Sequence, residues 1–168
     1  HSTETAILKI ASDVLDSADA SNITILAFLD LSAAFDLVDH AILLHRLSSS
    51  YGITGTALDW MRSFLSNRFQ TVHFADQQSS RSALTCGVPQ GFVLGPTLFT
   101  LYTADIIRIA QSFGVCIHCY ADDMQLYVHC KTEETDAAIK RLLNCIAAIE
   151  RWLGSNRLKM NPDKTQNI

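Results

Sequence analysis

The stretch HCYADDMQLYV, residues 118–128, places two adjacent carboxylates, Asp122 and Asp123, inside a run that otherwise has the composition of a buried β-hairpin. Adjacent like charges repel each other, and burying either one without a partner costs on the order of several kcal/mol. A foldable chain can accommodate the pair in two ways. Either the tip of the hairpin is an exposed turn, or the pair belongs to a metal site that needs concentrated negative charge.

A third carboxylate, Asp30, ends the apolar run ITILAFLD, residues 23–30. If this run and the hairpin form neighbouring strands, the three carboxylates meet at one end of a sheet. Such a cluster needs cations to remain ionised near neutral pH, and Mg²⁺ fits because it prefers hard oxygen ligands and leaves positions for water and phosphate. A pair of such ions can clamp the attacking and leaving oxygens of a phosphoryl transfer.

Apolar periodicity predicts an α+β fold with an antiparallel sheet and helices packed on one face. Apolar or alternating runs predict strands at 21–30, 68–87 (a hairpin turning near Gln77) and 115–128. Helical spacing predicts helices over residues 3–19, 36–47, 57–65, 96–113 and 132–153. In the last helix, the expected buried stripe is Ile139, Leu142, Leu143, Ile146, Ile149 and Leu153.

Composition narrows the class of protein. The 168 residues suit one ordinary domain, and a hydrophobic content of 48% with 18% charged residues excludes a disordered chain. No apolar run is long enough to span a bilayer. The net charge of −4 argues against binding nucleic acid over the whole surface, although it is compatible with a local basic patch.

The histidines show no metal-binding pattern. His40 and His45 are five residues apart on a predicted helix, which is a poorer spacing for two ligands than four. We interpret them, with His118 and His129, as surface or packed side chains.

Four segments resemble, in order and spacing, the palm motifs of reverse transcriptases, and more narrowly those of non-LTR (LINE-type) retrotransposons. They are FLDLSAAFDLVDHAILLHRL (28–47), GVPQGFVLGPTLF (87–99), YADDMQLYV (120–128) and NRLKMNPDKTQ (156–166). The resemblance implies that residues 1–168 form a single partial reverse transcriptase domain. It would be mainly an antiparallel polymerase palm with a short helical N-terminal segment, and with the fingers and thumb largely missing.

The resemblance also implies a set of metal ligands. Asp30 and Asp122 would be the principal ligands of two Mg²⁺ ions, with help from the carbonyl of Leu31, and Mn²⁺ is a possible substitute. Asp123 would be the less essential catalytic neighbour. The reaction would be attack of a primer 3′-hydroxyl on the α-phosphate of a deoxynucleotide, on an RNA template, with release of pyrophosphate.

Four residues are candidates for binding the nucleotide. Phe35, an aromatic residue five positions after the first carboxylate, would exclude a 2′-hydroxyl by its bulk; the alternative is a core phenylalanine. Gln90 and Gly91 would contact the sugar or phosphate, whereas without the family they would form an ordinary turn. Lys164 would protonate pyrophosphate or steady the triphosphate, unless it is simply a solvated side chain.

Three residues, Arg62, Arg68 and Tyr120, are candidates for contacting nucleic acid. Arginine suits bidentate contact with phosphate, and the alternative is a pair of exposed arginines at the end of a helix. One position departs from the LINE pattern, because Phe92 stands where serine is usual. The aromatic ring either repacks the pocket or marks a decayed copy.

The implied partners are an RNA template, a DNA primer and deoxynucleoside triphosphates, with no membrane. We expect the fingers, thumb and endonuclease segments of the parent polyprotein to be missing, so that the isolated chain polymerises poorly. The expected location is intracellular, in cytoplasm and nucleus. Two alternatives remain: a catalytically inactive remnant or domesticated nucleic-acid-binding module of the same fold, and a different two-metal phosphoryl-transfer enzyme such as a nucleotide cyclase or nuclease.

Overall fold

The computed structural model describes residues 3–89, 91–120, 122–161 and 166–167. The chain separates into two compact units. One consists of residues 1–34 together with 104–168, and we call it the sheet unit; the other consists of residues 35–103, and we call it the helix-hairpin unit. The assignment of the whole chain to a single partial domain stays a prediction.

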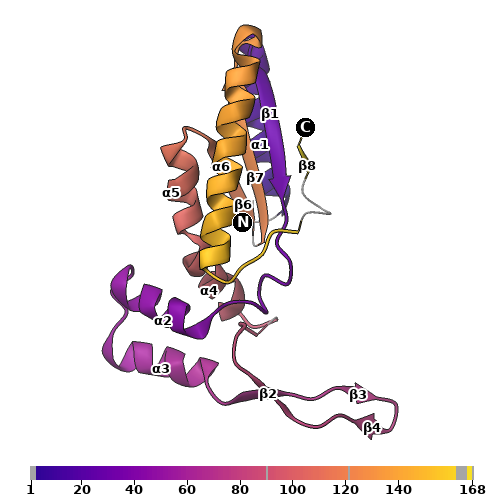
Figure 1. The fold of residues 1–168 in the computed structure, drawn as a ribbon, viewed down its shortest axis with the longest axis vertical. Helices are drawn as coiled ribbons and strands as arrows, with labels where there is room; N and C mark the ends of the chain where they lie inside the picture. Colours follow the sequence, from indigo (N-terminus) through magenta and orange to yellow (C-terminus); the bar gives the residue numbers. More distant parts are fainter. Residues whose placement is uncertain (1–2, 90, 121, 162–165, 168) are drawn as a thin grey trace. The chain divides into compact units, whose positions relative to one another are not determined.

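The sheet unit is built on a four-stranded antiparallel sheet in the order β6-β7-β1-β8 (Figure 1). In the pairing of β1 with β7, Leu29 lies opposite Met124, and in the β6–β7 hairpin Tyr120 lies opposite Asp123. The expected α+β class with an antiparallel sheet is confirmed. The strands are β1 (Ile23–Leu29), β6 (Cys116–Tyr120), β7 (Asp123–Cys130) and β8 (Gln166–Asn167).

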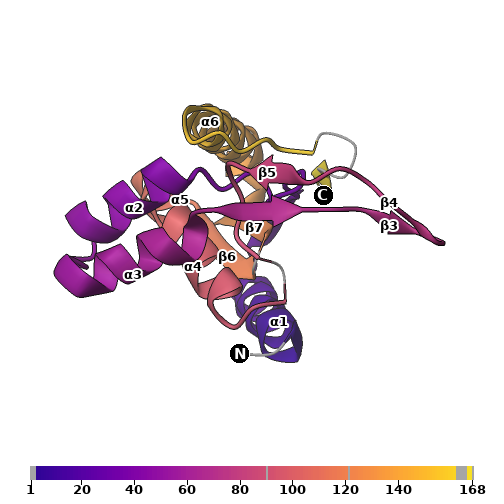
Figure 2. The same ribbon diagram turned by 90° about the horizontal axis from the view of Figure 1, so that it is seen from below.

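Helices cover both faces of this sheet, where the sequence analysis expected one. Figures 1 and 2 show α6 and α1 on opposite sides of the strands. Leu126 and Val128 are buried on one face, while Tyr127 points to the other face and donates a hydrogen bond to Asp13 of α1. The helices of this unit are α1 (Thr3–Asp19), α5 (Asp105–Ser112) and α6 (Thr135–Ser155), the last preceded by the 3₁₀ turn Thr132–Glu134.

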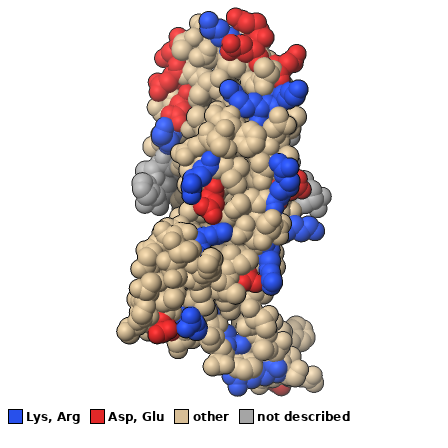
Figure 3. Space-filling view, turned by 60° about the vertical axis from the view of Figure 1, so that its left-hand side comes forward, with Lys and Arg blue, Asp and Glu red and all other residues tan. Residues whose placement is uncertain are grey.

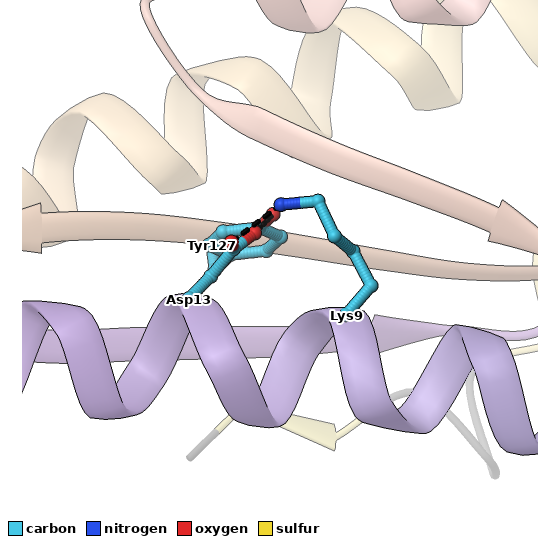
Figure 4. A network of polar contacts seen from close by, with 3 residues as sticks. All are labelled: Lys9, Asp13 and Tyr127. Atoms are coloured by element: carbon cyan, nitrogen blue, oxygen red, sulfur yellow. Dashed lines mark hydrogen bonds and ion pairs between the residues drawn. The ribbon is translucent and has the colours of Figure 1, made fainter.

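A polar network fastens α1 to the sheet (Figure 4). The hydroxyl of Tyr127 donates to Oδ2 of Asp13 at 2.5 Å, and the ammonium group of Lys9, one helical turn earlier, pairs with Oδ1. Lys9, followed by the Tyr127 hydroxyl, holds the pKa of Asp13 below its ordinary 3.8. Burial, followed by the hydrogen bond to Asp13, raises the pKa of the Tyr127 phenol.

The longest helix, α6, buries a stripe that is rotated from the one expected. Ile139 and Leu143, expected inside, are 39% and 50% exposed. The observed spacing of three and four residues still follows one helical face. None of the helices in the described part of the chain combines the length and apolarity needed to cross a membrane. The buried positions of α6 are Ala138, Leu142, Cys145, Ile149 and Leu153.

The helix-hairpin unit combines three helices with a two-part hairpin. The hairpin predicted over residues 68–87 is present, but its tip lies at Ala75 and Asp76, just before the expected Gln77. Ala75 adopts φ 50°, a left-handed conformation that tight turns need. The elements are α2 (His40–Ser49), α3 (Gly55–Leu65), β2 (Arg68–Gln70), β3 (His73–Phe74), β4 (Gln77–Gln78), β5 (Ser82–Leu84) and α4 (Leu94–Thr103).

Two helix boundaries differ from the prediction. Helix α2 begins at His40, and not near residue 36, because the carboxylate of Asp39 caps it by accepting the amide of Ile42 at 2.9 Å. The single helix expected over 96–113 is divided at Ala104 into α4 and α5, which belong to different compact units.

Candidate active site

Two of the three predicted carboxylates come together at one end of the sheet. Asp30 directly follows β1, and Asp123 is the first residue of β7. Leu29 pairs with Met124, so the next pair of opposite positions beyond them holds Asp30 and Asp123. Residues at opposite positions of paired strands project from the same face of the sheet. Both carboxylates line one hollow of about 340 Å³, together with Phe28, Leu29, Met124 and Gln125.

The third carboxylate, Asp122, lies in the tight turn between β6 and β7, next to the hollow's lining residue Asp123. Asp122 and Asp30 are half-buried, while Asp123 is exposed. The structure therefore brings Asp30 and Asp123 to one hollow, but among the described residues it does not form the single metal-holding group of all three carboxylates that the sequence predicted.

Asn161 holds Asp30 in place, and the sequence analysis did not identify it. Its backbone amide donates to the carbonyl of Asp30 at 2.8 Å, and its Nδ2 donates to the carboxylate oxygen Oδ2 at 3.0 Å. The contact spans 131 positions of the chain. The sequence signal for Asn161 is its place in the NRLKMNPDKTQ segment, which also contains the predicted triphosphate residue Lys164; that lysine lies outside the described residues.

The neighbouring Leu31 forms an isolated antiparallel bridge with Met160. The two hydrogen bonds of this bridge run from the amide of Asn161 to the carbonyl of Asp30, and from the amide of Ser32 to the carbonyl of Lys159. The Leu31 carbonyl accepts neither of them. Its predicted role as a metal ligand is compatible with this pairing and stays a prediction.

The donor chemistry of the hollow fits a hard divalent cation. Asp30 and Asp123 are among its lining residues, and the buried Oε1 of Gln125 has no hydrogen-bond partner in the described part of the chain. Magnesium usually takes one or two protein carboxylates and fills its other positions with water and phosphate. No group of three or more His, Cys, Asp or Glu side chains among the described residues is arranged to hold a metal ion.

Phe35 and the GVPQG segment meet in the helix-hairpin unit. The ring of Phe35 stacks on Phe99 of α4, with 4.9 Å between ring centroids, and its carbonyl accepts the amide of Val88 at 2.8 Å. Gly91 is exposed and has φ +83°, a conformation that favours glycine. Gln90 lies outside the described residues, so its predicted nucleotide contact stays a prediction.

The residues predicted to contact nucleic acid lie in different settings. Arg68 is half-buried and donates to the carbonyl of Gly87 at 3.1 Å. Arg62 is 58% exposed and pairs with Asp59 at 3.0 Å. Tyr120 is the last residue of β6, directly opposite Asp123 in the hairpin. Their contacts with nucleic acid stay predictions.

Phe92, the departure from the LINE pattern, takes part in a row of aromatic rings. Its edge meets Phe64 with 5.7 Å between centroids, and Phe64 stacks on Trp60 at the same distance. Phe92 is 57% exposed. Phe92 therefore packs at the end of this aromatic row, and both interpretations of the position, a repacked pocket and a decayed copy, stay predictions.

Figure 3 shows Asp and Glu side chains gathered mainly toward the upper end of the view, while Lys and Arg side chains are scattered over the parts below.

Comparison with known proteins places this arrangement in context. The sequence profile described as "Reverse transcriptase (RNA-dependent DNA polymerase)" matches residues 2–168. The RNA-directed DNA polymerase from the mobile element jockey of Drosophila funebris is 30% identical over 175 residues, and the jockey protein of Drosophila melanogaster is 28% identical over 173. Each alignment covers 100% of this chain, which spans about 18% of the length of these relatives.

The fold also resembles a solved structure of distant sequence. Apo telomerase from Candida tropicalis, truncated from its C-terminal domain, superposes with a TM-score of 0.71 at 16% sequence identity. The match covers 100% of this chain and 35% of the telomerase chain. At this identity the likeness establishes the fold alone.

Proposed function

The chain belongs to the reverse transcriptase (RNA-dependent DNA polymerase) family, with relatives in LINE-type retrotransposons, and we propose that it carries the catalytic centre for RNA-templated addition of deoxynucleotides to a DNA primer. The observation that carries the proposal is the pairing of β1 with β7, which delivers Asp30 and Asp123 to one hollow. The proposed partners are an RNA template, a DNA primer and deoxynucleoside triphosphates. We propose an intracellular location, in cytoplasm and nucleus.

Asp30, Asp122 and Asp123 are the proposed ligands for two divalent ions, Mg²⁺ or Mn²⁺, with the Leu31 carbonyl as a further donor. When bound, such ions polarise phosphoryl oxygens and neutralise the charge that develops during transfer. The three carboxylates would supply the negative charge that holds such cations. Asn161 fixes the orientation of Asp30 by donating to one of its two carboxylate oxygens.

The remaining residues serve binding and selection. Phe35 is the proposed barrier to a ribose 2′-hydroxyl, because a ring supported by Phe99 resists displacement by one extra oxygen atom. Gln90 and Gly91 are proposed to contact the nucleotide, and Lys164 the triphosphate. Arg62, Arg68 and Tyr120 are proposed to contact the nucleic acid.

The proposal is tested by template-directed nucleotide binding, which needs no turnover. The chain is mixed with an RNA template annealed to a dideoxy-terminated DNA primer, and the affinity for each deoxynucleotide is measured with and without Mg²⁺. We expect the deoxynucleotide complementary to the template base to bind at least about tenfold more tightly than the others, and only with Mg²⁺.

Two variants serve as comparison. Asp30→Asn keeps an oxygen that can accept the hydrogen bond from Asn161 but removes the charge, and we expect it to abolish the Mg²⁺-dependent affinity. Asp76→Asn, an exposed carboxylate in the β3–β4 turn, should leave it unchanged. Equal affinity for all four deoxynucleotides would instead favour a two-metal enzyme that reads no template. Absence of Mg²⁺-dependent binding would favour an inactive remnant.

A further inference from the structure

We propose that His40 and Arg68 are positioning residues which together hold the main-chain carbonyl of Gly87, and through it fix the backbone of Phe35 for sugar selection. The part that concerns sugar selection rests on the polymerase function proposed above. The contacts themselves lie wholly within the helix-hairpin unit.

Two side-chain donors converge on one carbonyl oxygen. Nε2 of His40, the first residue of α2, lies 2.8 Å from the carbonyl oxygen of Gly87, and the guanidinium of Arg68, the first residue of β2, lies 3.1 Å from it. A carbonyl can only accept, so Nε2 of His40 carries a proton. Both side chains are half-buried, where a hydrogen bond competes less with water.

The peptide groups beside this carbonyl are bonded to the segment that carries Phe35. The amide of Gly87 donates to the carbonyl of Val38 at 2.8 Å, and the amide of Val88 donates to the carbonyl of Phe35 at 2.8 Å. The approach is close, since a Cβ at Gly87 would lie 3.0 Å from the carbonyl oxygen of Asp36. A shift of the Gly87 carbonyl therefore moves the Val88 amide, which shares its peptide group, and weakens the hydrogen bond from that amide to the carbonyl of Phe35.

Phe35 is thus held at two points. Its ring rests on Phe99, and its carbonyl accepts from Val88. Loss of a donor to the Gly87 carbonyl leaves the contact between the rings of Phe35 and Phe99 in place, but it weakens the hydrogen bond that holds the Phe35 carbonyl. A barrier to one hydroxyl group works only if its backbone is fixed, because a small displacement would admit the extra oxygen. Neither His40 nor Arg68 needs to touch the nucleotide to have this effect.

The first readout is amide hydrogen exchange without any ligand, at the amides of residues 87 and 88. His40→Phe keeps a ring but has no donor, and we expect it to speed exchange about three- to tenfold, as loss of one hydrogen bond predicts. His40→Gln regains a side-chain N–H donor and should restore protection at least in part. His45→Ala, on the same helix and exposed, is the matched control and should change nothing.

Arg68 is tested in the same way. Arg68→Met should speed exchange at residue 87 in the absence of nucleic acid, while Arg62→Met, at an exposed arginine, should not. An effect seen only when nucleic acid is present would assign Arg68 to template phosphate and overturn its positioning role. Exchange at 87 and 88 that is equal in His40→Phe and His45→Ala, in proteins that melt alike, would overturn the role of His40.

The second readout is the ratio of affinities for a deoxynucleotide and the matching ribonucleotide in the presence of Mg²⁺. We expect His40→Phe to lower this ratio by at least about threefold and His40→Gln to recover it, while Phe35→Ala removes discrimination. A ratio that is unchanged in His40→Phe would overturn the link to Phe35. If the unmodified chain binds neither nucleotide, the polymerase function fails, and amide exchange alone decides whether His40 and Arg68 hold Gly87.

Discussion

The sheet unit and the helix-hairpin unit position their candidate functional groups by different means. In the sheet unit, strand pairing brings Asp30 and Asp123 to the same hollow, and the hydrogen bonds of that pairing come from the main chain. In the helix-hairpin unit, the side chains of His40 and Arg68 donate hydrogen bonds to the backbone carbonyl of Gly87. Replacing a carboxylate should therefore remove chemistry without moving the backbone, whereas changes around Gly87 should move the backbone itself.

After Asp30→Asn, which should abolish the Mg²⁺-dependent affinity, the largest effect is expected at Asp123. Asp123→Asn keeps the size of the side chain but removes one of the two charges that line the hollow. We expect Mg²⁺-dependent nucleotide affinity to fall by at least about a hundredfold, because a cation loses a charged ligand. Titration calorimetry with a deoxynucleotide and Mg²⁺ measures this loss.

The melting temperature gives the control for that substitution. Strand pairing rests on main-chain hydrogen bonds, and asparagine keeps the size and an acceptor oxygen of the side chain, so Asp123→Asn should melt within a few degrees of the unmodified chain. A large drop in melting temperature together with the lost affinity would mean that the carboxylate maintains the fold, and the distinction between the two units would fail.

A second, smaller effect is expected at Asn161, which orients Asp30. Asn161→Ala removes the donor to Oδ2 but leaves the backbone hydrogen bond. Loss of such a partner typically lowers metal affinity or activity by about 10- to 100-fold. The measurement is Mg²⁺-dependent nucleotide affinity, with Asn144→Ala, at an exposed position of α6, as the control. Equal affinities in both variants would show that strand register alone orients Asp30.

The third prediction compares two glycines of the helix-hairpin unit. Gly52 and Gly87 both have positive φ, at +67° and +88°, but only Gly87 has backbone atoms where a Cβ would go. Gly52→Ala should cost about 1 kcal/mol of unfolding free energy from conformation alone. Gly87→Ala should cost about 1–2 kcal/mol more, because the Cβ presses on Asp36. Denaturant unfolding measures both losses of unfolding free energy, and equal losses in the two variants would contradict the close approach of Gly87 to the backbone of Asp36.

The smallest effect concerns the docking of α1. The pKa of Asp13 is lowered by Lys9 and Tyr127, so its carboxylate adds stability above about pH 4 and loses this contribution as the pH falls through the lowered pKa. Asp13→Asn should cost about 1 kcal/mol near pH 7 and progressively less below pH 4. Melting curves across this range test it, with Asp19→Asn as control. A difference in stability between Asp13→Asn and the unmodified chain that stays constant with pH would contradict the ionic contact.

The meeting of Asp30 with a carboxylate of the hairpin tip was predictable from sequence, because its signals are local. Asp30 ends an apolar run, and Asp122 and Asp123 interrupt another, so that both features can be read within ten residues. Sequence alone could not give the register that selects which of the adjacent carboxylates lines the hollow. A shift by one residue turns every side chain of a strand to the opposite face.

Long-range polar contacts were missed for a physical reason. His40 was compared with His45 as a possible metal pair, whereas its partner is a carbonyl 47 positions away. Asn161 contacts Asp30 across 131 positions. Such contacts leave no periodic pattern in the sequence. The division of the expected helix at Ala104 was also missed, since apolar spacing continues across it.

Paramagnetic broadening by Mn²⁺ tests the central claim most directly. Mn²⁺ is added in small steps to the isotope-labelled chain, with a deoxynucleotide present, and amide signals are followed by NMR. The account predicts selective broadening at residues 28–31 and 122–125, reversal by excess Mg²⁺, and no selective broadening in Asp30→Asn. Broadening centred on other carboxylates, such as Asp16 or Asp76, or equal broadening with and without the Asp30 charge, would contradict it.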